Sequence, residues 1–249
     1  MPRRLKQVLY GAFYLAIFAG IFWLWYANSL RPAPTCTDQR RNQGETEVDC
    51  GGPCAPCELR GLKQVTAENV RFMKLGSDVA VVARLTNPNE GYRARVTYEV
   101  RFTSSGIKTH ETTGTLIVYP ESPAHMYVLR HDADRDTNAS VFVLSTEWEA
   151  HDPLSLPSVA VGEAETAIGS DGSAVVTGSV ENRGLFPLRN VEIIAILKTE
   201  NEFPVFASRT EEDIPAGAVR SFTVTFPKSG EFTERVSGEK TEIIAHAGE

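Results

Sequence analysis

The side chains best suited to chemistry in this chain are four cysteines, which all fall within 22 consecutive residues. They are Cys36, Cys50, Cys54 and Cys57, in the stretch CTDQRRNQGETEVDCGGPCAPC. Cysteines can pair as disulfides, bind zinc as thiolates or act as a redox couple. The even number and the short spacing favour two local disulfides, and the sequence leaves three connectivities open.

Two other uses of these cysteines remain as alternatives. A Cys₄ zinc site would use the ligand spacing of Cys54 and Cys57, but Cys36 and Cys50 do not form a matching second pair. A redox-active Cys54-Ala-Pro-Cys57 would be expected beside a βαβ unit, and no such pattern surrounds it. We therefore assign all four cysteines to disulfides and predict no metal site.

Oxygen-bearing side chains gather in two segments, and Ca²⁺ prefers oxygen ligands. The cysteine stretch carries Asp38, Asn42, Glu45 and Asp49. A later segment carries Asp132, Asp134 and Asp136 at alternate positions, as an EF-hand loop begins. That match ends at Thr137, which replaces the required Gly, and at Val143, which replaces the bidentate Glu. Solvated turn residues are the simpler interpretation of both segments, and the sequence leaves calcium binding open.

Histidines could supply general acids, bases or metal ligands, and the chain has His110, His125, His131, His151 and His246. The last two end predicted strands, where we expect a structural or solvent-facing role. No nucleophile elbow, P-loop, dinucleotide-binding glycine pattern or HExxH motif is present, and no cysteine follows Cys57. We therefore expect that the protein is not an enzyme, with no catalytic residue, no cofactor-binding residue and no cofactor.

The cysteine stretch resembles a small module of bacterial and archaeal extracellular proteins, patterned Cys-x-Asp-Gly-x-x-Asn-x-x-Glu-x-x-x-Asp-Cys-Gly-Gly-x-Cys-x-x-Cys. The matching residues are Cys36, Asp38, Asn42, Glu45, Asp49, Cys50, Gly51, Gly52, Cys54 and Cys57. Gln39 replaces the glycine that usually follows the aspartate, which questions the geometry of the first turn. The resemblance implies a disulfide-held knuckle outside the cell and brings no activity with it.

The elements that must position these residues begin with an apolar segment near the N-terminus. Residues 8–27 carry no charge, and as a helix they would span about 30 Å, the thickness of the hydrocarbon core of a bilayer. Because Arg3, Arg4 and Lys6 precede this segment, we expect the N-terminus in the cytoplasm and the rest outside. A cleaved signal peptide is the alternative, with a small-x-small site at residues 27–29.

The charge of the chain bears on its partners. The net charge is −7, and the first 27 residues hold three basic and no acidic side chains, so the remainder carries about −10. A basic surface that binds nucleic acid is not expected on that balance. We expect the membrane, through residues 8–28, and an unidentified protein of the envelope as partners.

Beyond residue 59 the hydrophobic pattern has a period of two. Val96, Tyr98, Val100 and Phe102 alternate with polar residues, as do the apolar residues of 191–197 and of 222–226. Short runs rich in Pro, Gly, Asn and Ser separate such segments. Many short strands without an amphipathic helix between them indicate a mainly β fold of antiparallel sandwiches.

A shift of 95 residues aligns the β-rich part with itself without a gap. Aligned pairs include Val81 with Val176, Asn87 with Asn182, Val96 with Val191, Pro120 with Pro215, and Tyr127 with Phe222. This period suits an immunoglobulin-like domain, so we predict two tandem sandwiches joined at residues 152–157. We expect residues 154–249 to fold alone, with Ile193 in the core and Glu192 facing solvent.

Each copy opens with a strand, an Asn-containing turn and a second strand, in VARLTNPNEGYRARVTYEVRF and TGSVENRGLFPLRNVEIIAIL. This opening looks like that of the bacterial sandwich family named for its Phe-x-Leu-Tyr-Asp signature, and like the late-embryogenesis-abundant type of sandwich. The signature itself is absent from both copies. The resemblance implies an exported binding or spacer module and supplies no site residues.

Together these patterns predict five parts: a cytoplasmic N-terminus (1–7), a transmembrane helix (8–28), a cysteine-rich knuckle (29–59) and two β-sandwich domains (60–153 and 154–249). We expect a single-pass protein of a prokaryotic plasma membrane that acts outside the cytoplasm as a binding or structural interaction module. The alternative is an accessory subunit of a membrane complex, in which small residues of the helix allow close contact with partner helices. The ligand, the partner and the oligomeric state stay open.

Overall fold

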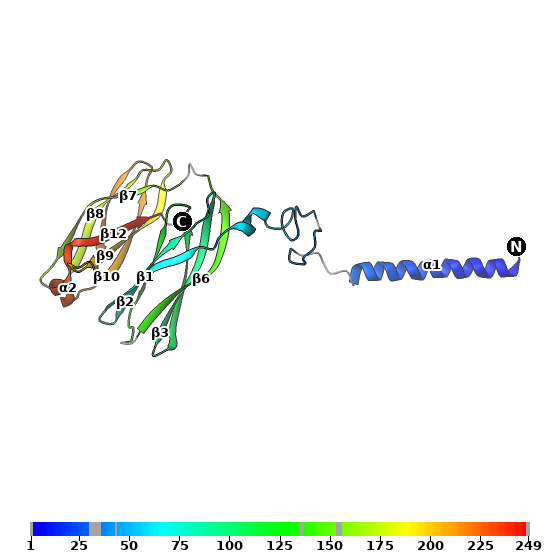
Figure 1. The fold of residues 1–249 in the computed structure, drawn as a ribbon, viewed down its shortest axis with the longest axis horizontal. Coiled ribbons are helices and arrows are strands. Elements are labelled where there is room, and N and C mark those ends of the chain that lie inside the picture. The colour runs from blue at the N-terminus through cyan, green and yellow to red at the C-terminus, as the bar shows by residue number, and fades with distance from the viewer. Residues whose placement is uncertain (1, 30–35, 43, 135–136, 153–155, 248–249) are drawn as a thin grey trace. The chain divides into compact units, whose positions relative to one another are not determined.

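The computed structural model describes residues 2–29, 36–42, 44–134, 137–152 and 156–247. Its residues form two compact units, Met1–Leu62 and Lys63–Glu249. The first unit holds one long helix and the cysteine-rich segment, and the second holds all twelve strands (Figure 1). The mainly β class expected from the sequence is therefore confirmed.

Helix α1 runs from Arg3 to Ser29. Its segment Arg3–Tyr26 is long and apolar enough to cross a membrane, and none of it is buried within the protein. A helix whose apolar side chains have no protein core to cover them requires another apolar environment, and a bilayer supplies one. Whether the helix is retained or cleaved, and which way it faces, stay predictions.

Residues 63–134 and 137–152 contain six antiparallel strands that form two three-stranded sheets. They are β1 (Thr66–Leu75), β2 (Asp78–Thr86), β3 (Tyr92–Ser104), β4 (Ile107–Val118), β5 (Ala124–Arg130) and β6 (Thr137–Ala150). One sheet has the order β1-β2-β5 and the other β4-β3-β6. Their facing sides enclose a core that includes Val81, Leu85, Val96, Val100 and Phe102.

The second half of the unit repeats this arrangement. Its strands are β7 (Val159–Ile168), β8 (Ala174–Asn182), β9 (Leu188–Lys198), β10 (Pro204–Ile214), β11 (Val219–Thr225) and β12 (Ser237–His246). The sheet orders β11-β8-β7 and β10-β9-β12 match those of the first half, strand for strand. We refer to the two halves as the first and second sandwich.

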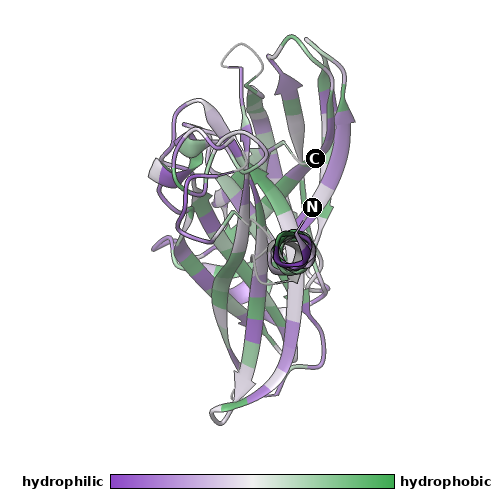
Figure 2. Cartoon of the chain, turned by 90° about the vertical axis from the view of Figure 1, so that its right-hand side faces the viewer, coloured by the Kyte–Doolittle hydropathy of each residue, from purple (hydrophilic) through white to green (hydrophobic). Residues whose placement is uncertain are grey.

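The alternating pattern predicted for β3 is confirmed by its burial. Val96, Val100 and Phe102 have no exposed surface, and the polar residues between them are more accessible except Glu99. Figure 2 shows the same alternation of hydrophobic and hydrophilic residues along several strands. Such strands cover a core with one face and meet solvent with the other.

Strand β9 departs from the expected pattern because both of its faces are buried. Val191, Ile193, Ala195 and Leu197 are fully buried, as predicted, but Ile194 and Ile196 on the opposite face are fully buried too. A single hydrophobic cluster joins Ile194 and Ile196 to Ala80, Val82 and Tyr127 of the first sandwich. Sheets β1-β2-β5 and β10-β9-β12 thus pack face to face, and the two sandwiches share buried surface.

This packing corrects the expectation that Glu192 faces solvent. Its side chain is 24% exposed and forms an ion pair with Arg209, at 2.9 Å between Oε1 and Nη1. Glu192 is the cross-strand partner of His246, which is itself buried. The division into domains at residues 153 and 154 stays a prediction, since residues 153–155 of the predicted linker lie outside the described residues.

Two short helices among the described residues were not expected from the sequence, the 3-10 helix η1 (Cys57–Gly61) and one in the second sandwich. Helix α2 (Gly230–Arg235) precedes β12, and Ser229 caps it by accepting a hydrogen bond from the Glu231 N–H. Phe232 on this helix is fully buried in the core of the second sandwich. The Ser229-Gly230-Glu231 sequence, which looks like a turn, is therefore a helix start.

The shared surface leads to a test at Glu192. Glu192→Lys removes the ion pair with Arg209 and puts two cations side by side in a half-buried place, so we expect a loss of about 1–3 kcal/mol of stability. The measurement is the free energy of unfolding in denaturant. Glu165→Lys, on the exposed face of β7, is the matched control and should change stability by no more than about 0.5 kcal/mol. Equal, small effects of the two changes would contradict the packing of the sandwiches.

Candidate binding site

The four cysteines form two disulfides, Cys36–Cys54 and Cys50–Cys57. Cys54 and Cys57 therefore bond to different partners, and the redox pair considered from their spacing is not formed. Two groups, Cys36–Glu45–Cys54 and Glu47–Cys50–Cys57, bring possible metal ligands within 4.8 Å of one another. Their sulfur atoms are used in the disulfides, so a zinc site would require reduction first.

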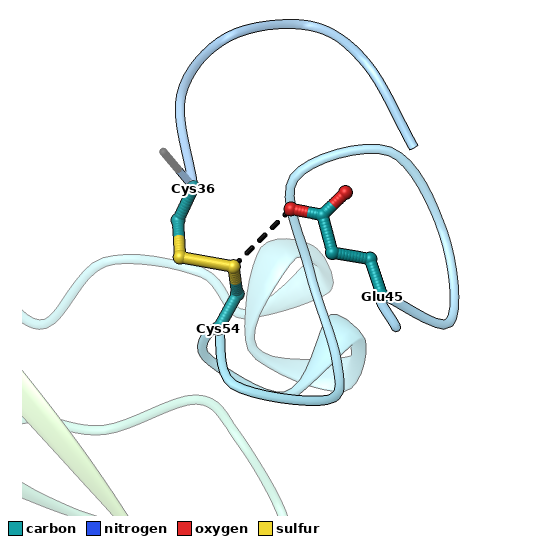
Figure 3. Close-up of side chains that lie close together, drawn as sticks. All are labelled: Cys36, Glu45 and Cys54. Carbon is teal, nitrogen blue, oxygen red and sulfur yellow. Dashed lines mark hydrogen bonds between the residues drawn. A yellow bond between two sulfur atoms is a disulfide. The ribbon is translucent and has the colours of Figure 1, made fainter. Parts of the chain in front are cut away.

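Glu45 lies at the centre of the knuckle and is only 4% exposed. Its Oε2 accepts hydrogen bonds from the backbone N–H groups of Asn42 (3.1 Å) and Asp49 (3.2 Å). Its Oε1 lies 3.2 Å from Sγ of Cys54, the contact marked in Figure 3. A disulfide sulfur carries no proton, so this last contact is a close approach of oxygen to sulfur and not a conventional hydrogen bond.

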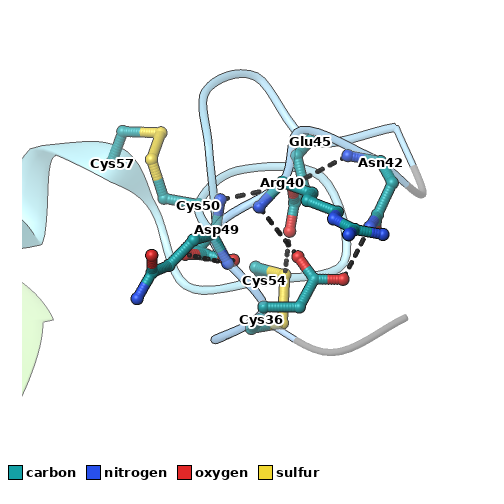
Figure 4. The surroundings of a disulfide bond; sticks show 10 residues. Cys36, Arg40, Asn42, Glu45, Asp49, Cys50, Cys54 and Cys57 are labelled. Atoms are coloured by element: carbon teal, nitrogen blue, oxygen red, sulfur yellow. Dashed lines mark hydrogen bonds between the residues drawn. A yellow bond between two sulfur atoms is a disulfide. The ribbon is translucent and has the colours of Figure 1, made fainter. Parts of the chain in front are cut away.

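The other oxygen-bearing side chains of the knuckle are also used within it (Figure 4). Asp49 accepts from the Gln39 N–H with both oxygens, each at 3.0 Å. Asp38 accepts from the Arg40 N–H at 2.9 Å and from the Asn42 side-chain amide at 2.7 Å. These four side chains hold the loop closed, which is a more specific role than the solvated turn residues expected.

Five described residues of the knuckle have backbone conformations that favour glycine, namely Gln39, Gly44, Asp49, Gly51 and Gly52. Gln39 takes φ 58°, so the residue that replaces the usual glycine adopts the left-handed conformation itself, and its N–H is held by Asp49. Gly51 and Gly52 also have positive φ, and a Cβ on either would collide with Thr46 or Gly44.

The second acidic segment, residues 132–138, is described only in part. Asp136 lies outside the described residues, and Asp132 and Asp134 are both exposed. The backbone carbonyl of Asp134 accepts a hydrogen bond from Nζ of Lys74 at 2.7 Å. Calcium binding at residues 132–138 stays an open question.

Two histidines meet where the sandwiches pack together. His125 is the second residue of β5, His246 ends β12, and their ring centroids are 6.1 Å apart. Neither Nδ1 atom has a hydrogen-bond partner within the described part of the chain. Burial lowers the pKa of His246 to about 3, with His125 and Arg209 adding to the effect. Burial and the neighbouring Arg84 lower the pKa of His125 to about 4.

His246 is 8% exposed at the junction, which agrees with the structural one of the two roles expected for it. His125 lines a small cavity of about 120 Å³ with Arg71, Arg84 and Glu242. Glu242 binds both Arg71 and Lys198, each at 2.7 Å. The surroundings therefore hold more cations than anions, which disfavours protonated histidine.

On another part of the same junction lies a larger cleft of about 490 Å³, which we call the junction cleft. Its lining residues are Tyr98, Thr112, Thr113, Tyr127, Val128, Leu129, Ser208 and Arg209. They belong to β3 and to three edge strands, namely β4 and β5 of the first sandwich and β10 of the second. Edge strands leave backbone N–H and C=O groups unpaired, so the cleft can offer backbone as well as side-chain hydrogen bonds.

Tyr98 reaches the junction cleft across Gly114, its cross-strand partner on β4. A Cβ at Gly114 would collide with the Tyr98 hydroxyl, so the glycine makes room for the phenol. This hydroxyl has no protein hydrogen-bond partner among the residues that the structure describes. Burial raises the pKa of Tyr98, so the group stays a neutral O–H donor at ordinary pH.

Arg209 forms the charged side of the junction cleft. Its guanidinium lies 2.9 Å from Glu192 and 3.6 Å from Glu211, and its Cζ is 5.6 Å from the ring centroid of Tyr127. The Tyr127 hydroxyl donates to the Ala207 carbonyl at 3.2 Å, and burial raises its pKa to about 12. The cleft therefore combines a fixed cation, neutral hydroxyls and strand edges.

Comparisons with known proteins assign neither a family nor a function to this chain. No known protein family matches the chain, and no curated protein matches it. The exo-chitosanase CsxA of Amycolatopsis orientalis is 15% identical over 73% of this chain and 26% of its own, with a TM-score of 0.25. A β-glucuronidase of glycoside hydrolase family 2 is 13% identical over 60% and 20% of the two chains, with a TM-score of 0.21. The chain spans about a quarter of the chitosanase, and likeness at this level carries no functional argument.

Replacing Glu45 tests its role in the knuckle. Glu45→Ala leaves two backbone N–H groups without their acceptor, which costs about 1–3 kcal/mol of local stability. The amides of Asn42 and Asp49 should therefore exchange hydrogen faster, as measured by NMR or mass spectrometry. Glu47→Ala, at an exposed position two residues away, should leave both amides protected. Unchanged exchange in Glu45→Ala would show that the carboxylate does not hold the loop.

The histidine pair leads to a prediction about pH. Because the pKa of each histidine is lowered in the folded state, the unfolded chain takes up protons first, so stability is full above about pH 6.5 and falls as the pH decreases. By pH 5 the loss should reach up to ~2 kcal/mol per histidine. His246→Gln should remove its share of this loss, whereas His110→Gln, at an exposed position, should not. A stability that stays constant from pH 7 to pH 5 would contradict the burial of the pair.

Proposed function

We propose that the protein is anchored in the plasma membrane by α1, with a cytoplasmic N-terminus, and binds a partner outside the cytoplasm at the junction cleft. The observation that carries this proposal is the Tyr98 hydroxyl, which opens into the cleft without a protein partner although the residue is only 9% exposed. The hydroxyl is not one of the buried polar atoms that lack a partner, so solvent reaches it in the cleft. A ligand that accepts a hydrogen bond would replace that solvent.

The surroundings of the hydroxyl support a ligand with an extended polar backbone. Thr112, Thr113 and Ser208 are short side chains that leave the strand edges approachable. Peptides bind such edges by adding a strand, with main-chain hydrogen bonds supplying affinity and side-chain pockets supplying specificity. We therefore propose a segment of an envelope protein as the partner and assign no catalytic role to the chain.

Two features support a role as a display module. The disulfides of the knuckle suit an oxidising compartment outside the cytoplasm. Because the two sandwiches pack face to face, residues of both line the junction cleft. The site therefore depends on the fixed arrangement of the two sandwiches. An accessory subunit of a membrane complex is the second candidate, supported by the uncovered apolar surface of α1.

A photo-crosslinking amino acid at Thr112 tests binding at the cleft in native membranes. Placed there, it should join the chain to one discrete species, and Tyr98→Phe should reduce the yield by about 5- to 10-fold because a desolvated hydrogen bond is lost. Glu200, exposed in the turn after β9, is the control position and should give no product. Equal products from both positions, or a yield unaffected by Tyr98→Phe, would refute binding at the junction cleft.

Anchoring and orientation need a separate test. Protease added outside spheroplasts should digest the part after α1, and the intact mass of the isolated protein should include Met1 or Pro2, because the positively charged N-terminus is retained inside. Solubilised protein that runs as a monomer favours the display module, and a stoichiometric assembly favours the accessory subunit. A mature N-terminus at Leu30 would overturn the anchor.

A further inference from the structure

The turn between the second and third strands is built in the same way in both sandwiches. In the first, the side-chain amide of Asn87 donates to the carbonyls of Tyr92 (2.7 Å) and Val118 (3.2 Å). In the second, the amide of Asn182 donates to the carbonyls of Phe186 (2.8 Å) and Ile214 (3.1 Å). Both asparagines are buried, so each turn has a fixed backbone.

The tips of these two turns carry different side chains. In the second sandwich Leu185 is 79% exposed and Phe186 is 57% exposed. The first turn is one residue longer, because the carbonyls bound by the two asparagines belong to Tyr92 and Phe186. Tyr92 is therefore the counterpart of Phe186, whereas Glu90 and Gly91 offer no apolar counterpart of Leu185. The Leu185 side chain is thus not needed to build the turn.

Val219 extends this exposed apolar surface. It is 58% exposed and begins β11 directly after a turn that binds Asn182, through Gly217 N–H to the Asn182 carbonyl and Asn182 N–H to the Ala218 carbonyl. We call Leu185, Phe186 and Val219 the apolar tip. Exposed apolar side chains on two turns that hydrogen-bond to each other are typical of an interaction surface.

The apolar tip lies at the end of its unit where the chain arrives from α1 and the knuckle. Lys63, the first residue of the unit, exchanges backbone hydrogen bonds with the side chain of Asn89 in the equivalent turn of the first sandwich. At the same end, Ser122 of the first sandwich shares a cavity with Ser158 and His246 of the second. The carbonyl of Ser158 in turn accepts a hydrogen bond from the Arg183 N–H, two residues from Leu185.

The charges around the apolar tip suit lipid headgroups. Arg183, Arg189 and Arg220 are exposed and lie within three residues of the tip along the chain, and only Arg183 has an ion pair among the described residues, with Glu181. Asp213 is engaged by the backbone N–H of Asn190. Apolar side chains flanked by arginines match the interface of a bilayer, where the former reach the acyl chains and the latter meet phosphate groups.

We propose that the apolar tip inserts into the outer surface of the bilayer that α1 spans, giving the extracytoplasmic part a second membrane contact. This inference rests on the proposed membrane anchoring. Two or three side chains bind a bilayer weakly by themselves, but the tether keeps the lipid at high effective concentration. Insertion would restrict the orientation of the sandwiches, and with them the direction in which the junction cleft opens.

The test uses the full chain in protein-free lipid nanodiscs that contain phosphatidylcholine and phosphatidylglycerol. An environment-sensitive fluorescent amino acid replaces Leu185 in one variant and Glu90 in the other, which is the matched position of the first sandwich. At 185, quenching by lipids brominated in their acyl chains should exceed that at 90 by about threefold or more, and quenching by aqueous iodide should be lower. In a third variant, Phe186→Asp with the probe at 185, this difference should disappear.

Each outcome bears on one claim. Chain that does not enter nanodiscs refutes the anchoring and therefore the proposed function. Chain that enters them but shows equal quenching at both positions overturns insertion of the tip and leaves the anchoring intact. Protection of position 185 that appears only in native membranes, and not in the protein-free nanodiscs, would assign the tip to a protein partner and likewise overturn the lipid proposal.

Discussion

The face-to-face packing of the inner sheets is the interaction on which the rest of the second unit depends. Ile194 and Ile196 of β9 lie against Ala80, Val82 and Tyr127 of the first sandwich, and all five are nearly or fully buried. Apolar burial of this kind stabilises by about 25 cal/mol for each Å² removed from water. The contact also sets the geometry of the junction cleft, because β5 and β10 border it from opposite sandwiches.

The same contact explains why charged and titratable groups gather around it. Beyond the apolar strip, the facing sheets bring together Arg71 of β1 with Glu242 of β12, and they partly bury the pair that Arg209 and Glu192 form within one sheet. Such pairs compensate for their own desolvation and disfavour other packings in which they would be left unpaired. His125 and His246 are kept neutral there, so acid weakens the packing at the junction.

The sequence predicted much of this fold and less of the site. The period-two pattern and the shift of 95 residues indicated strands whose order and pairing the structure repeats. Asn87 and Asn182, matched by that shift, make equivalent hydrogen bonds. These features are local, or recur at a fixed spacing along the chain, so a single sequence is enough to recognise them.

The junction depends instead on how the two repeats pack, which a repeat pattern does not specify. One signal was present: Ile193–Leu197 is a continuous apolar run, which indicates a strand buried on both faces. The period-two pattern of residues 191–197 predicted one buried face and one exposed face, so Glu192 was expected to face solvent. For Tyr98 and Arg209 no such signal exists, since residues of their types also fit a core and a solvated face.

The central claim, that the two sandwiches form one body through their inner sheets, is tested most directly by hydrogen exchange under native conditions. The backbone amides of the central strands β2 and β9 should open together, with the same free energy of opening in the wild type. A core change in the first sandwich, Val81→Ala, which removes a fully buried side chain, should lower that free energy equally in both strands. If β9 keeps its protection while β2 loses it, the sandwiches are independent and the account is wrong.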